Sequence, residues 1–231
     1  MNIQNRKNKR SNRSTNSKNT EFYIVYTVAF LLIAFFLYMR FYLNGKSLVW
    51  SHDGVPQHLN SLAYYGRYLR GILYTIFVEH RFSIPMWDLH IGYGSDILTT
   101  LNYYVMGDPL TLLAVFCPSS KTEILYEFLI FLRIYLAGIA FSRYCFYHKN
   151  SRQATFMGCM IYIFAGWTIY AAMKHPYFSN PMIYLPLILM GIDKIYKKEK
   201  PYLFIWSVAV AGLSNFYFFY MFCFFVIFSR F

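Results

Sequence analysis

The chain has 231 residues, of which 57% are hydrophobic, 22% are aromatic and only 14% are charged. A soluble globular domain carries far more charge, so the composition indicates a membrane protein and excludes an ordinary water-soluble enzyme. The formal net charge of +12 would suit a nucleic-acid-binding protein, but thirteen of the 22 basic residues are concentrated at 6–18, 143–152 and 194–200. Such clusters are typical of cytoplasmic flanks of membrane spans, and we expect no nucleic-acid partner.

The chain begins with a polar, basic segment and continues into a long apolar one. Residues 1–21 contain six Lys or Arg side chains and a single acidic residue, Glu21, and such a composition cannot bury a core. We expect a disordered tail in the cytoplasm, because Lys and Arg beside a span are retained on that side. Residues 22–43 are long enough to cross a bilayer and lack a small-residue cleavage pattern, which predicts a permanent anchor. Residues 44–96 then form an extracytoplasmic loop.

The predicted extracytoplasmic loop contains one helix and one turn-rich segment. Apolar side chains recur at helical spacing between Leu59 and Phe77, with polar side chains mostly on the opposite side. This pattern predicts an amphipathic helix lying on the outer membrane surface, with Pro56 in its first turn. Residues 85–96 contain Trp87 and two glycines, which indicates an open loop whose backbone a ligand can approach.

Five further apolar stretches follow, and their orientations constrain one another. They are residues 97–117, 123–146, 153–173, 177–196 and 201–228. If the basic loops at 143–152 and 194–200 are cytoplasmic, all but the first of these stretches cross the bilayer. Residues 97–117 should not cross, and Asp108 with Pro109 interrupts them, so they form either a re-entrant helix pair or two short helices at the interface. The predicted fold class is therefore all-α, with a polytopic membrane domain over residues 22–231 and about five transmembrane helices.

Asp53 is the candidate catalytic residue. It lies in a polar stretch just after the first span, so the predicted topology places its carboxylate at the outer face of the membrane. A structural alternative is an Asp-Gly turn that leads into the next helix. The functional alternative is a general base, since a partly shielded carboxylate can accept the proton of an acceptor hydroxyl as that oxygen attacks a sugar carbon. One carboxylate suffices for a single-displacement, inverting transfer.

Three arginines are candidate ligands for a phosphate. Arg133 lies near the middle of the span at 123–146, where an unpaired charge is costly, so it should face the helix bundle and have a partner. That partner is either the phosphate of a lipid carrier or an ion pair with another helix, since Glu127 is poorly placed on the same helix. Arg67 and Arg70, on the polar side of the loop helix, bind either a carrier phosphate or ordinary anionic headgroups.

Motifs for metal, nucleotide or disulfide chemistry are missing from the sequence. The external histidines His52, His58, His90 and His175 form no H-x-x-x-H or H-x-H pair, so we predict no metal ion. The four cysteines lie in or beside apolar stretches without C-x-x-C spacing, and we expect them to be buried apolar residues. Since there is also no Walker loop, nucleophile elbow or dinucleotide fingerprint, we expect no cofactor.

Several short motifs occur in order from about residue 22 to the end of the chain. They are Asp53 with Gln57, Trp87 with Gly92 and Gly94, Tyr104 with Asp108-Pro109, Pro118, Arg133 with Gly138, Asn180-Pro181 with Gly191, and Asn215-Phe216-Tyr217 with Tyr220-Met221. Each motif is short, but their order over most of the chain resembles that of the bacterial YfhO membrane proteins, of the glycosyltransferase-C (GT-C) type.

This resemblance implies a polytopic membrane enzyme of GT-C-like architecture. Its donor would be a sugar on an undecaprenyl-phosphate carrier, and its acceptor would be an extracytoplasmic cell-surface polymer such as lipoteichoic acid. Asp53 occupies the place of the acidic residue in the first loop that GT-C enzymes use as base, and Arg133 or Arg67 would stabilise the departing phosphate. This chemistry requires neither a metal nor another cofactor. The expected substrate-binding residues are Gln57, Arg67, Trp87, Asp108, Arg133 and His175.

Two other functions agree with these features. A transporter or flippase for lipid-linked sugars also uses broken helices and an intramembrane arginine. A non-catalytic fragment is the second alternative, because members of the family are several times longer and this chain resembles only their amino-terminal part. We therefore expect a truncated family member from a Gram-positive cell envelope, a multi-pass protein of the cell membrane with its N-terminus in the cytoplasm.

Overall fold

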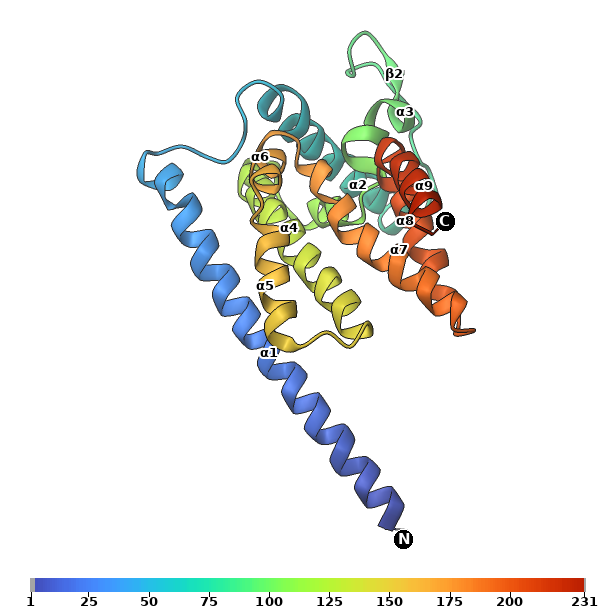
Figure 1. Ribbon diagram of the computed structural model, residues 1–231. Helices are drawn as coiled ribbons and strands as arrows, with labels where there is room; N and C mark the ends of the chain where they lie inside the picture. Colours follow the sequence, from blue (N-terminus) through green and yellow to red (C-terminus); the bar gives the residue numbers. More distant parts are fainter. Residues whose placement is uncertain (1–2, 231) are drawn as a thin grey trace.

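The computed structural model describes the backbone of residues 3–230 and the side chains of residues 19–228, and most of the chain is helical (Figure 1). The α-helices are α1 (Ile3–Leu43), α2 (Asn60–Phe77), α3 (Ile97–Leu101), α4 (Thr122–Tyr147), α5 (Arg152–Ile163), α6 (Gly166–Lys174), α7 (Pro181–Tyr196), α8 (Tyr202–Ser214) and α9 (Phe216–Arg230). Short 3-10 or π-helical segments lie between them, namely η1 (Gly54–Leu59), η2 (Asn102–Met106), η3 (Pro109–Phe116), η4 (Ser119–Lys121) and η5 (Pro176–Ser179). A two-residue antiparallel ladder pairs β1 (Trp87–Asp88) with β2 (Ser95–Asp96). The prediction of an all-α membrane protein is confirmed.

Two helices in the described part of the chain are long and apolar enough to cross a membrane. They are Asn19–Leu43, within α1, and Ser119–Tyr147, which contains α4. The number rises to three if α5 and α6, which meet at a bend of 45°, are counted as one span. The sequence predicts about five spans, and those at 22–43 and 123–146 are confirmed by length and composition. Each of the other three is divided into two shorter helical pieces.

Each of these divisions has a local cause in the sequence. Ala165 is extended between α5 and α6. Pro176 and Pro181 begin η5 and α7, because proline suits the first turn of a helix but not its middle. Asn215 is extended between α8 and α9, and its Oδ1 accepts a hydrogen bond from the backbone N–H of Phe218, as a residue that caps a helix does. The apolar composition of these stretches hides the breaks, because mean hydropathy averages over them.

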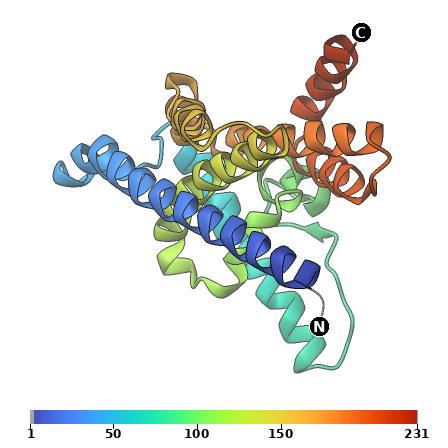
Figure 2. The ribbon, with the colours of Figure 1, turned by 60° about the horizontal axis from the view of Figure 1, so that its bottom comes forward.

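The long helix α1 lies on one side of the molecule, and α7, α8 and α9 lie on the other (Figures 1 and 2). The backbone of α1 is helical from Ile3 onward, which includes residues that the sequence predicts to form a disordered tail. Extending an existing helix costs much less than starting one, so the apolar half of α1 accounts for this helical backbone. The side chains of residues 1–18 lie outside the described ones, and the mobility of the tail stays a prediction.

The segment 97–117 and the predicted loop helix pack against each other. Residues 97–117 form the short helices α3, η2 and η3, none of which reaches the length of a span. The predicted loop helix is confirmed as α2, and its Gly66 lies so close to η3 that a Cβ there would be 2.8 Å from the carbonyl oxygen of Ala114. Leu62 is buried, whereas Phe77 is 71% exposed. Part of the apolar face of α2 is therefore covered by protein rather than by lipid.

The interface between α1 and α4 joins the two long spans. Tyr26 of α1 is fully buried, and its hydroxyl donates a hydrogen bond to the backbone oxygen of Tyr135 at 2.8 Å. Gly138 leaves the space for that phenol, because a Cβ at this position would overlap the Tyr26 oxygen. Gly191 similarly allows α7 to approach α8, where a Cβ would lie only 2.7 Å from the Cα of Phe204. Close helix packing therefore explains why these two positions hold glycine.

Candidate functional site

Asp53 lies in the loop between α1 and α2, immediately before the π-helical turn η1. Its side chain is 31% exposed, and its Oδ1 accepts a hydrogen bond from Nε2 of Gln57 at 3.2 Å. The Oε1 atom of Gln57 in turn accepts a hydrogen bond from the hydroxyl of Tyr104 at 3.2 Å. The carboxylate is thus oriented by the protein and remains accessible to a ligand.

Two histidines lie beside Asp53. Nε2 of His175 is 3.7 Å from Oδ2 of Asp53. Nδ1 of His175 is 3.0 Å from Nε2 of His58, a hydrogen-bond distance. The position of His175 at the end of α6 follows from Pro176, which disfavours the helical conformation at the residue before it. His58 has no exposed surface and packs against the ring of Tyr177.

Burial disfavours the charged form of both histidines. It lowers the pKa of His58 to about 4. The nearby His175 and Arg133 add to this shift of the His58 pKa, and Asp53 opposes it. Burial also lowers the pKa of His175, where Asp53 again opposes the effect and Lys174 adds to it. Both shifts favour the neutral imidazole, which carries one N–H.

Arg133 of α4 has the partner that its position requires. Its Nη2 donates a hydrogen bond to Oδ2 of Asp108 at 2.6 Å, and its Nε donates one to Oδ1 of Asn180 at 2.9 Å. Both charged side chains are only 2% exposed, and the guanidinium carbon lies 5.0 Å from the centre of the Tyr177 ring. Nδ2 of Asn180 donates to Oγ of Ser214 at 3.1 Å. Of the two partners that the sequence allows for Arg133, the structure shows the ion pair with another helix.

Asp108 has a second structural contact. Its Oδ1 accepts a hydrogen bond from the backbone N–H of Leu110 at 2.9 Å, and Pro109 occupies the first position of η3. The side chain therefore caps a helix and neutralises Arg133 at the same time. Because the pair is buried and its hydrogen bonds are satisfied within the protein, the geometry favours a structural role for both residues over the expected substrate-binding role.

Arg67 and Trp87 line a separate hollow of about 350 Å³ between α2 and the loop that follows it. Arg67 is exposed, with its guanidinium 6.0 Å from the centre of the Tyr64 ring, and Trp87 is 61% exposed. Hydrogen bonds, chiefly from the Tyr64 hydroxyl at 2.6 Å, lower the pKa of Asp88 to about 2. A cation, an anion and an exposed aromatic ring therefore surround a hollow that shares no residue with the Asp53 cluster.

Arg70 contacts the protein rather than a hollow. Its Nη1 donates hydrogen bonds to the carbonyl oxygens of Ala114 and Cys117, at 2.9 Å and 2.5 Å, where η3 ends. Carbonyls at a helix end have no partner within the helix, and a cation there also meets the negative end of the helix dipole. The structure thus gives Arg70 a capping contact in place of the phosphate or headgroup that the sequence suggests.

The predicted site residues fall into three groups: Asp53, Gln57 and His175; Asp108 and Arg133; and Arg67 and Trp87. Tyr177 connects the first two groups, because its ring contacts both His58 and Arg133. His58 is the main residue that sequence reasoning missed. It follows Asp53 by five positions, which an α-helix would turn to a different side, but η1 is π-helical and turns more slowly. No sequence signal for that local geometry is evident.

The described residues contain neither a metal-binding cluster nor a disulfide. No three His, Cys, Asp or Glu side chains between residues 19 and 228 are arranged to hold a metal ion. The four cysteines are free thiols. Cys145 and Cys159 are buried as expected, whereas Cys117 is half-buried. Cys223 is exposed, because α9, which contains it, has few neighbours in this chain.

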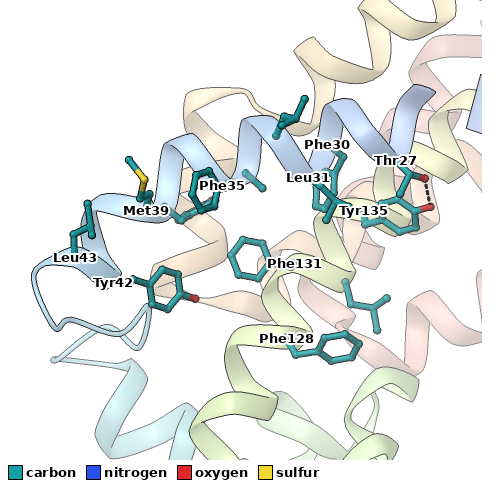
Figure 3. A pocket seen from close by; sticks show the side chains of 14 residues that line it. Thr27, Phe30, Leu31, Phe35, Met39, Tyr42, Leu43, Phe128, Phe131 and Tyr135 are labelled. Carbon is teal, nitrogen blue, oxygen red and sulfur yellow. Dashed lines mark hydrogen bonds between the residues drawn. The ribbon is translucent and has the colours of Figure 1, made fainter. Parts of the chain in front are cut away.

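An apolar groove of about 980 Å³ lies between α1 and α4 (Figure 3). Leu31 and Phe35 of α1 and Phe131 of α4 are among the side chains that line it. The groove extends to Leu43, the last residue of α1, where the chain turns toward the loop that contains Asp53. It therefore runs along the two long spans and ends where α1 leads into the candidate catalytic loop.

Comparison with known protein families identifies the family to which the chain belongs. The family described as "Bacterial membrane protein YfhO" matches residues 25–230, which include every candidate site residue. The chain belongs to the YfhO family. A relative from Bacillus subtilis (strain 168), described as "Uncharacterized protein YfhO", is 23% identical over 200 residues, which cover 80% of this chain and 22% of the relative. This YfhO-family chain thus spans about a fifth of that relative's length, and no solved structure matches it.

Proposed function

We propose that this YfhO-family protein transfers a sugar from a polyprenyl-phosphate carrier to a polymer on the outer surface of the cell, such as lipoteichoic acid. The observation that supports this proposal is the arrangement of Asp53. Its carboxylate follows the first span, is one-third exposed, and is oriented by Gln57 with His175 beside it. An accessible, oriented carboxylate at a membrane surface suits a general base.

The proposed reaction is a single displacement. The acceptor hydroxyl gives its proton to Asp53 while the acceptor oxygen forms a bond to the anomeric carbon of the sugar. The bond from that carbon to the carrier phosphate breaks, and the phosphate leaves with the electron pair, so the anomeric configuration inverts. A cation near the leaving oxygen stabilises its charge. Arg133 suits this role poorly, because its charge is already neutralised by Asp108. The exposed Arg67 suits it only if the carrier phosphate reaches the separate hollow beside Trp87.

The groove between α1 and α4 supports a carrier with an isoprenoid tail. Its lining is almost entirely apolar, and both helices are long enough to cross the membrane. An isoprenoid chain matches such a lining and would bring its phosphate toward the outer end of α1. The groove is therefore proposed to hold the tail while the loop with Asp53 meets the sugar.

Replacing Leu31 by Trp should weaken use of the carrier, because the larger ring fills part of the groove. We expect the KM for the polyprenyl donor to rise about tenfold, as for the loss of roughly 1.4 kcal/mol of binding, with kcat little changed. Val25→Trp is the matched control, since Val25 is also exposed on α1 but does not line the groove. Equal KM values for both variants would contradict the proposed place of the tail.

The function itself can be tested with membrane vesicles from cells that express the protein. The vesicles receive undecaprenyl phosphate bearing a radiolabelled hexose, tested as a panel of sugars, together with a polyglycerol-phosphate acceptor. We expect label to appear in the acceptor only when the protein is present. Vesicles that leave the acceptor unlabelled with every sugar would contradict the proposal.

A flippase for lipid-linked sugars is the second candidate function. The 45° bend between α5 and α6 and the buried Arg133–Asp108 pair favour it, since transporters use broken helices and interior charges. The same vesicles distinguish the two functions. A flippase would move the labelled lipid between leaflets, as measured by its access to a periodate reagent outside, without labelling the acceptor.

A further inference from the structure

The histidine beside the proposed base is held by a second, fully buried histidine. His58 has no exposed surface, and its Nε2 lies 3.0 Å from Nδ1 of His175. Its other nitrogen, Nδ1, has no hydrogen-bond partner among the described residues. Leaving a buried polar atom without a partner costs free energy, so such a group needs an explanation. The hydrogen bond with His175 is the polar contact that the structure describes for the His58 side chain.

The short distance between the rings determines which nitrogen of His175 carries the proton. One of the two facing nitrogens must donate and the other must accept. If Nε2–H of His58 donates, the neutral His175 carries its own proton on Nε2, which faces Oδ2 of Asp53 at 3.7 Å. If His175 donated instead, a neutral ring would turn a bare lone pair toward the carboxylate. Burial lowers the pKa of both histidines, which disfavours a doubly protonated ring. Between the two neutral arrangements, the first is favoured because it turns an N–H rather than a lone pair toward the carboxylate of Asp53.

We propose that His58 and His175 form a neutral pair that directs an N–H at Asp53 and holds its carboxylate in the orientation needed for proton transfer. This inference rests on the proposed role of Asp53 as base. His175 contacts the base directly, and His58 is a positioning residue that acts through His175. The distance of 3.7 Å is longer than a hydrogen bond, and we expect it to shorten when substrates bind, as catalytic contacts often do.

The surroundings of the two rings fit a positioning role. The ring of His58 packs edge-on against His175 at a centroid distance of 5.2 Å, and it also contacts Tyr104 and Tyr177. The ring of His175 is stacked on Phe178 at 4.9 Å. Aromatic neighbours on several sides restrict rotation of both imidazoles, so that their nitrogen atoms keep their directions.

The arrangement of protons can be measured without any activity. In the full chain labelled with ¹⁵N-histidine in detergent micelles, we expect His175 at pH 7 to be neutral with its proton on Nε2. His58→Leu removes the donor, so the fraction of His175 that carries its proton on Nε2 should fall, because only Asp53 then favours that tautomer. An unchanged Nε2–H tautomer in folded His58→Leu protein would overturn the proposal, whether or not the protein transfers sugar.

The catalytic arm uses three variants in the sugar-transfer assay. We expect His58→Leu to lower kcat about tenfold with little change in KM, because a positioning residue does not contact the substrate. His58→Gln should restore most of the loss, since its amide can still donate. His80→Asn is the control, because His80 is an exposed residue after α2 with a positive φ of 50°, a conformation that Asn accepts.

A double variant distinguishes an effect of His58 through His175 from an effect of His58 on folding. His175→Gln directs an amide N–H toward Asp53 without needing a particular tautomer. If His58 acts through His175, adding His58→Leu to His175→Gln should lower kcat no further. A further tenfold loss in the double variant would overturn the proposal and indicate that His58 only supports the fold.

Discussion

Sugar transfer by the Asp53→Asn variant should be about 10²- to 10⁴-fold slower than transfer by the unmodified protein, the range that a general base contributes. Asparagine has nearly the same size as aspartate but cannot accept the proton of the acceptor hydroxyl. Its side-chain oxygen can still accept the hydrogen bond that Gln57 donates, so the loop should keep its conformation. The measurement is kcat for transfer of labelled sugar in membrane vesicles, supported by the sugar content of the surface polymer in cells.

Two further substitutions separate a lost base from a lost charge. Glu79→Gln removes a carboxylate just after the end of α2, where Glu79 forms an ion pair with the exposed Arg81, and transfer should be unchanged. Asp53→Glu keeps the carboxylate but moves it by one methylene, so we expect partial activity. Normal glycosylation by Asp53→Asn would remove Asp53 from the mechanism.

The second large effect is on stability. Arg133→Met should lower the free energy of unfolding by about 3–5 kcal/mol, because it leaves the carboxylate of Asp108 buried without its cation. Asp108→Leu alone should cost a similar amount by leaving the guanidinium unneutralised. Removal of both charges leaves no isolated charge, and the double variant should recover most of the loss. The measurement is unfolding in mixed detergent and dodecyl sulfate micelles, analysed as a double-mutant cycle.

A surface ion pair provides the matched control for this cycle. Arg152 lies 4.0 Å from Glu21, and the two side chains are 41% and 68% exposed. Arg152→Met should therefore change the free energy of unfolding by at most about 1 kcal/mol. If Arg133→Met had an equally small effect, the buried pair would contribute nothing to the fold, and a phosphate partner for Arg133 would again be plausible.

The features that the sequence predicts correctly depend on local patterns. The apolar runs at 22–43 and 123–146 give two long helices, and the helical spacing after Pro56 gives α2. The interior position of Arg133 follows from the cost of a charge in an apolar span. These conclusions need only neighbouring residues and general energetics, which explains why they hold.

The features that the sequence does not show depend on contacts between distant residues. Arg133 pairs with Asp108, 25 residues earlier, and with Asn180, 47 residues later. Hydropathy cannot identify such partners. The contact between His58 and His175 spans 117 residues and also requires the π-helical turn at η1. Consequently the sequence could indicate Asp53 and Gln57 as parts of one motif, but it could not show that His58 and His175 contact each other beside them.

Tyr177 belongs both to the scaffold and to the candidate site. One side of its ring faces the guanidinium of Arg133, and its ring also contacts that of His58. A substitution that disturbs the buried charges will therefore shift the imidazoles through this shared phenol. If an Arg133 variant loses sugar transfer, the first explanation is therefore that the histidines are misaligned. The loss indicates phosphate recognition by Arg133 only if the His175 tautomer is unchanged.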